Sequence, residues 1–210
     1  MTFCVNGSIP SATGRMTHVA AAWRRRCGAV VAMEPGRVSS PGEKSQAMTA
    51  EAADLLASLN AQRRHVLAAI DGLSERQLRQ PVLPSGWHCL GMVKHLALAD
   101  EHYWFRSIVG GQPLDFFPPE PGADWQVDVD ESAASVLDLY RNEIEQANRI
   151  IDATDLDAPP RQRDPQWDAW GIDFPSLRYI MLHVITETAC HAGHLDAARE
   201  LLDGKQWLVL

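Results

Sequence analysis

Three histidines and a glutamate lie within thirteen residues near the C-terminus, in the stretch HVITETACHAGHL that begins at His183. Imidazoles and carboxylates bind transition metals and transfer protons. Apolar residues at steps of three and four predict a helix over about residues 176–203. Glu187 and His191 fall in the middle of its apolar stripe, four residues apart and on one face. The face of the helix that should be buried therefore carries titratable groups.

A second helix, predicted over about residues 90–109, has the same feature. Its stripe runs through Met92, His95, Ala99 and His102. A buried carboxylate costs several kcal/mol unless it is compensated. A divalent metal bound by His95, Glu187 and His191 would compensate it, and this donor set suits zinc, nickel or iron.

Three protein ligands would leave a coordination position open, which is typical of a catalytic metal site. The spacing also permits a simpler interpretation. Glu187 and His191 could form a hydrogen-bonded pair one helical turn apart, with His95 as an ordinary core or rim histidine.

Four helices and their connections would position these groups. Apolar periodicity predicts helices over about residues 49–73, 90–109, 131–153 and 176–203, with Asp130 and Ser176 as N-caps and Gly204 as a C-cap. Arg63 and Arg64 are expected on the solvated surface of the first helix. The sequence shows no convincing strand. Long connections at 110–130 and 154–175 suggest crossovers that carry specificity. The predicted fold is therefore an all-α four-helix bundle with long crossover loops.

Charge separates an N-terminal segment from the rest. Residues 1–48 have a balance of +4 and the remainder one of −12, within a net charge of −8. The segment is rich in Gly, Ser, Thr and Pro, so we expect a disordered extension at 1–48 and one domain at 49–210. Translation starting at Met33 or Met48 would remove most or all of the extension.

Composition argues against several functions. The net negative charge disfavours nucleic acid as the main partner. No apolar run is long enough for a membrane span. The four cysteines are widely spaced and form no CxxC motif, so neither a disulfide framework nor a cysteine zinc site is expected. We therefore expect a protein of the reducing cytoplasm.

Two blocks carry a family resemblance. The stretch SGWHCLGMVKHLALADEHYWFRSIVGG, followed far downstream by LRYIMLHVITETACHAGHLDAARELLDG, resembles the DinB-like superfamily. The resemblance is closest to the actinobacterial branch related to mycothiol-dependent maleylpyruvate isomerase and mycothiol S-transferases, and it covers about residues 49–206. It implies a four-helix bundle with a divalent metal, and its ligand positions correspond to His95, Glu187 and His191. His194, where relatives often have glutamine, is expected to orient a ligand, touch substrate or lie at the rim.

The function implied by the resemblance is metal-dependent activation of a low-molecular-weight thiol. The metal, most simply zinc with nickel or iron as alternatives, would generate a reactive thiolate from mycothiol for S-transfer to, or isomerisation of, an electrophilic small molecule. Two alternatives remain: a metal-assisted hydrolase, and a non-catalytic metal-binding or stress-response protein. The resemblance also suggests a homodimer.

Overall fold

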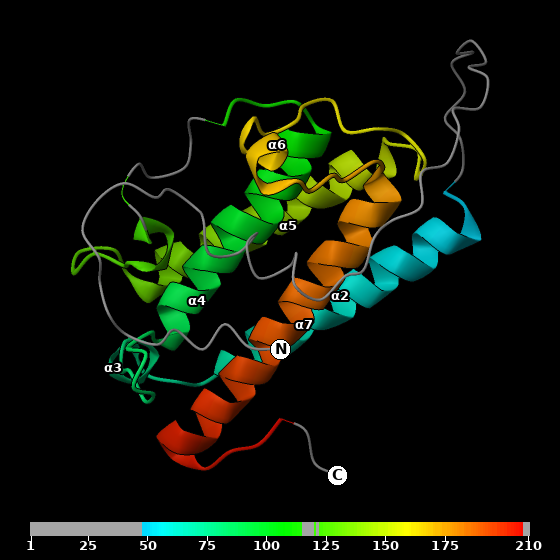
Figure 1. The fold of residues 1–210 in the computed structure, drawn as a ribbon. Helices are drawn as coiled ribbons and strands as arrows, with labels where there is room; N and C mark the ends of the chain where they lie inside the picture. Colours follow the sequence, from blue (N-terminus) through cyan, green and yellow to red (C-terminus); the bar gives the residue numbers. More distant parts are fainter. Residues whose placement is uncertain (1–47, 115–119, 121, 208–210) are drawn as a thin grey trace, which may run out of the picture.

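The computed structural model describes residues 48–114, 120 and 122–207, and this part of the chain is all-helical, as predicted (Figure 1). The expected extension at 1–48 lies outside the described residues except for Met48. The long elements are α2 (Ala50–Ile70), α4 (Cys89–His95) continuing into η1 (Leu96–Val109), α5 (Ala133–Asp152) and α7 (Leu177–Asp203). The short elements are α3 (Glu75–Leu78), η2 (Ala123–Trp125) and α6 (Gln166–Trp170).

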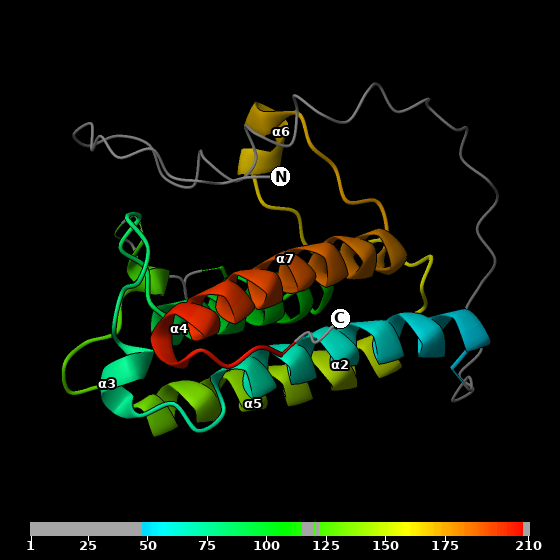
Figure 2. The same cartoon turned by 90° about the horizontal axis from the view of Figure 1, so that it is seen from below.

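The long helices pack lengthwise against one another. α7 lies along α2, and η1 lies along α5 (Figure 2). α4 and η1 also contact α7, so α7 has α2 on one side and the α4–η1 segment on another. This places the two histidine-bearing segments, which are distant in the chain, in direct contact. No described helix is long and apolar enough to cross a membrane.

Helix ends follow the predicted chemistry with one correction. The Ser176 side chain accepts a hydrogen bond from the backbone at Tyr179, and Gly204 ends α7 in the left-handed conformation with φ of 77°, as predicted. The prediction that Asp130 caps the third long helix is wrong. Ser132 caps α5 by accepting a hydrogen bond from the Ser135 backbone N–H.

The second predicted helix changes character after His95. It begins as α-helix and continues from Leu96 as a π-helix, whose hydrogen bonds span five residues. The wider turn changes which side chains face the core. Asp100 and Glu101 are buried, whereas Ala99 and His102 are only partly buried. The prediction that Ala99 continues the buried stripe is therefore wrong.

The π-helix places a buried ion pair inside the protein. Arg63 Nε donates to Glu101 Oε1 at 2.7 Å, and Arg63 Nη2 donates to Glu101 Oε2 at 2.5 Å. Arg63 Nη1 also donates to side-chain oxygens of Asn60 and Asn148. Arg63 is 2% exposed and Glu101 is fully buried, so the expectation of a solvated Arg63 is wrong. Of the two adjacent arginines, Arg63 and Arg64, it is Arg64 that is exposed.

The crossover at 154–175 is anchored by buried hydrogen bonds to η1. Tyr103 donates through its hydroxyl to Asp164 Oδ2 at 3.0 Å, and Trp167 Nε1 donates to the same hydroxyl at 3.1 Å. Near this anchor, the His183 ring packs edge-on against Trp104 and Phe174, with ring centroids 4.8 and 5.0 Å away.

The environment of His183 predicts an acid-sensitive stability. Burial lowers the His183 pKa to about 4, whereas an unfolded histidine titrates near pH 6.5. Between these pH values the unfolded chain binds a proton that the folded protein excludes, so the free energy of unfolding falls as pH falls. Between pH 7 and pH 5, we expect the free energy of unfolding of the wild-type protein to fall by about 2 kcal/mol more than that of His183→Phe. Urea unfolding of the metal-free protein at both pH values measures this. An unchanged loss in the variant would contradict the assignment.

Candidate metal centre

Two of the predicted ligands meet between α4 and α7. The ring centroids of His95 and His191 lie 5.3 Å apart, and the ring planes are nearly perpendicular at 86°. His95 is the last residue of α4, at the junction with the π-helix, and His191 lies in the middle of α7. The sequence prediction that these two distant segments converge is thus confirmed.

Glu187 lies one helical turn before His191 on the same face of α7. Its carboxylate is partly buried, and it makes no hydrogen bond or ion pair within the described part of the chain. Burial raises its pKa, while the nearby His95 lowers it. A partly buried acid near His95, without a hydrogen-bond donor among the described residues, is a group that a cation would stabilise.

The three side chains do not form a ready-made metal cage. Across residues 48–114, 120 and 122–207, no group of three or more His, Cys, Asp and Glu side chains is arranged to hold a metal ion. The donor types nevertheless fit a divalent transition metal, because two imidazoles and a carboxylate are common ligands of zinc. The assignment of His95, Glu187 and His191 as a ligand set stays a prediction.

In the described part of the chain, His191 has a ring nitrogen without a hydrogen-bond partner and a lowered pKa. Its Nδ1 is buried and has no hydrogen-bond partner among the described residues. Burial, helped by His95 and His194, lowers its pKa to about 3. The imidazole is therefore neutral at physiological pH, and neutral imidazole is the form that binds metals.

The structure adds two residues that the sequence analysis missed. Asp124 and Trp125 form the short turn η2, which covers His95. The Asp124 carboxylate Oδ2 lies 2.5 Å from His95 Nδ1, and Asp124 is buried. The Trp125 ring stacks on His95 with centroids 3.9 Å apart and planes inclined by 17°. A carboxylate behind a histidine is a common arrangement in metal sites.

One sequence feature, a glycine inside a helix, could have indicated the contact between η2 and α4. Gly91 lies one turn before His95 inside α4, where glycine is unfavourable unless something approaches closely. A Cβ at Gly91 would lie 2.4 Å from the carbonyl oxygen of Trp125. The glycine therefore makes room for the backbone of η2, and through it for Asp124.

The close approach at Gly91 gives a testable prediction. We expect Gly91→Ala to displace η2 and to destabilise the protein by about 1–3 kcal/mol, because the clash is with backbone. The matched control is Gly193→Ala in α7, where a Cβ meets nothing within 4 Å. The control should be neutral or stabilising by up to about 1 kcal/mol, because alanine favours helix over glycine. Urea unfolding compares the two variants, and equal effects would contradict the close approach.

Asp100 is a buried acid that interacts electrostatically with Glu187. Burial raises its pKa well above the ordinary value, and Glu187 and Glu101 raise it further. The Thr188 hydroxyl lies 2.8 Å from the Val184 carbonyl oxygen and 3.3 Å from Asp100 Oδ2. The single hydroxyl proton can satisfy only one of these acceptors fully.

His194 lies next to His191 at the partly exposed edge of the site. Their ring centroids are 5.9 Å apart, and the Trp87 ring lies 6.3 Å from His194 on the other side. Burial lowers the His194 pKa. This position is compatible with contact to a ligand or to substrate, and that role of His194 stays a prediction.

The remaining histidines near these helices serve other contacts. His88 caps α4, with its Nδ1 accepting a hydrogen bond from the Gly91 backbone at 3.0 Å. His102 lies 3.3 Å from Glu143 of α5. Neither His88 nor His102 is part of the candidate site formed by His95 and His191.

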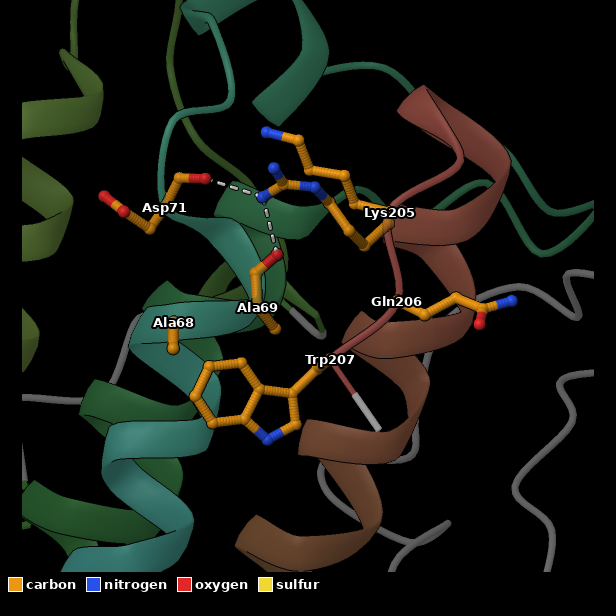
Figure 3. A pocket seen from close by; sticks show the side chains of 7 residues that line it. Ala68, Ala69, Asp71, Lys205, Gln206 and Trp207 are labelled. Atoms are coloured by element: carbon orange, nitrogen blue, oxygen red, sulfur yellow. Dashed lines mark hydrogen bonds between the residues drawn. The ribbon is translucent and has the colours of Figure 1, made fainter. Parts of the chain in front are cut away.

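A pocket of about 240 Å³, which neither His95 nor His191 lines, lies where the C-terminal ends of α2 and α7 meet the following segment (Figure 3). Trp207 forms one wall of this pocket. Inside it, Arg199 donates to the carbonyl oxygens of Ala69 at 3.0 Å and Asp71 at 2.7 Å. These bonds satisfy carbonyls at the end of α2. The guanidinium is thus already used in holding α2 against α7.

Comparison with known proteins places the chain in a family. A search of curated proteins finds no match. The model of the family described as mycothiol-S-transferase matches residues 54–204, a range that contains His95, Glu187, His191 and the η2 turn. Since the match spans well over half of the sequence, the chain belongs to the mycothiol-S-transferase family.

Proposed function

We propose that this protein is a divalent-metal-dependent enzyme that activates mycothiol for transfer to an electrophilic small molecule, with isomerisation as the related outcome. The observation that carries the proposal is the meeting of the His95 and His191 rings, with Glu187 one helical turn before His191 and close enough to His95 for the two to interact electrostatically. Membership of the mycothiol-S-transferase family supports the choice of thiol. The proposed architecture is the DinB-like four-helix bundle over residues 49–210.

The proposed ligands are His95, Glu187 and His191, with zinc as the first choice and nickel or iron as alternatives. When bound, such a metal supplies the positive charge that stabilises a thiolate at neutral pH. The chain contributes two imidazoles and one carboxylate, which would leave room for the sulfur of the cosubstrate. Trp125 shields one face of His95 from water.

The described cysteines support an external thiol. Cys89 is buried, and burial raises its pKa to about 11. Cys190 is exposed, but burial of its thiol and the nearby Glu187 raise its pKa too. Neither is a ready thiolate at neutral pH, since a reactive cysteine requires a lowered pKa. The properties of these two cysteines support a nucleophile that comes from the cosubstrate.

The test compares turnover with and without thiol. Zinc-loaded protein is mixed with an electrophilic dye in the presence and absence of mycothiol. We expect turnover that requires both thiol and metal, that a chelator removes, and that Cys190→Ser retains. Turnover that ignores thiol would indicate metal-assisted hydrolysis, and a protein that neither binds metal nor turns over the dye would be a non-catalytic member of the family.

A further inference from the structure

We propose that Asp124 is a positioning residue that fixes the His95 imidazole in a single tautomer, with the proton on Nδ1 and the free lone pair on Nε2. The expected effect of Asp124 on metal affinity rests on the proposed function, whereas the assignment of the His95 tautomer does not. Neither the family description nor the sequence pattern assigns a role to Asp124.

The first support is the contact itself. Asp124 Oδ2 lies 2.5 Å from His95 Nδ1, and both residues are at most 9% exposed. An ionised carboxylate is only an acceptor, so this hydrogen bond requires the proton on Nδ1. A neutral imidazole has one ring proton. Nε2 is therefore left as a lone-pair donor, which is the property that a metal ligand needs.

The second support is that the structure holds Asp124 firmly in place. Trp125 N donates to the Gly122 carbonyl oxygen at 3.1 Å and closes the turn. On the far side of the turn, Lys94 Nζ donates to the Gln126 carbonyl oxygen at 2.9 Å and to Glu131 Oε2 at 2.7 Å. Lys94 directly precedes His95 in α4, so the turn is bound to the helix that carries His95. The same helix therefore positions both the proposed ligand His95 and the Asp124 carboxylate.

The third support is the stacking of Trp125. Its ring stacks on the His95 ring, with centroids 3.9 Å apart and planes inclined by 17°, and so restricts rotation of the imidazole about its side-chain bonds. Stacking sets the plane of the ring, and the carboxylate decides which nitrogen carries the proton. Together they preorganise one donor atom before any metal binds. Loss of such a carboxylate partner typically costs 10–100-fold in metal affinity.

The test uses two substitutions and a control. Asp124→Asn keeps the shape and removes the charge, and Asp124→Ala removes the acceptor. Asp128→Asn changes an exposed acid four residues along. Long-range proton–nitrogen NMR of the metal-free protein identifies the protonated nitrogen of His95. Competition with a chromogenic chelator gives the Kd for zinc, and thermal unfolding without metal measures any effect on folding.

We expect Nδ1 of His95 to carry the proton in the wild-type protein and in Asp128→Asn, and a mixture of tautomers in Asp124→Ala. The zinc Kd should rise roughly 10–100-fold in both Asp124 variants and stay unchanged in the control. A purely structural role would lower the melting temperature without this change in Kd. A proton on Nε2 in the wild-type protein, or unchanged zinc affinity in both Asp124 variants, would overturn the proposal. If the wild type binds no zinc but Nδ1 is protonated, the proposed function fails and the tautomer assignment stands.

Discussion

His95→Ala protein is expected to lose both its bound metal and its thiol-dependent turnover, with zinc affinity lowered by more than about 100-fold. This loss of zinc affinity is larger than the loss expected for the Asp124 variants, because His95→Ala removes a proposed ligand itself. His95 is the only proposed ligand from α4, so its loss leaves Glu187 and His191 on one helix with no donor from the facing helix. Elemental analysis of purified protein and the dye assay measure the two effects.

The matched control for this substitution is His102→Ala. His102 lies seven residues later on the same continuous helical segment and contacts Glu143 rather than the His95–His191 pair. It should keep full metal content, and circular dichroism should confirm that both variants are folded. A folded His95→Ala protein that retains its metal would contradict the ligand set. Equal metal loss in both variants would show a general effect on structure.

Arg63→Ala is expected to destabilise the protein by about 3–5 kcal/mol, because it leaves Glu101 buried without its partner. The loss is a large share of the 5–15 kcal/mol that typically separates folded from unfolded protein. Asp100 is a neighbouring acid, so the uncompensated carboxylate would lie beside a second acidic group. Urea unfolding measures the change in the free energy of unfolding.

Arg64→Ala is the control, because Arg64 is the adjacent residue and its side chain is exposed. We expect a change within about 0.5 kcal/mol for this variant. Arg63→Met combined with Glu101→Leu should recover much of the loss, since apolar replacement of a whole buried ion pair is often neutral. Equal stabilities of Arg63→Ala and Arg64→Ala would contradict the presence of a buried Arg63–Glu101 ion pair.

Local sequence patterns were sufficient to predict the long helices and the two segments that carry the candidate site. Periodic apolar residues and capping residues, such as Ser176 and Gly204, act within a few positions of one another, so they can be recognised locally. His95 and His191 were identifiable because polar groups interrupted two apolar stripes. The structure confirms that these two residues meet.

The residues that surround His95 and His191 could not be predicted from these local patterns. The switch to a π-helix after His95 shifts the buried face to Asp100 and Glu101, and a pattern read at 3.6 residues per turn misses that shift. Burial of Arg63 depends on Glu101, which is 38 residues away. Asp124 reaches His95 from a loop that has no periodic signal. These contacts depend on the path of the backbone between distant residues, whereas sequence periodicity reports only on neighbours along one helix.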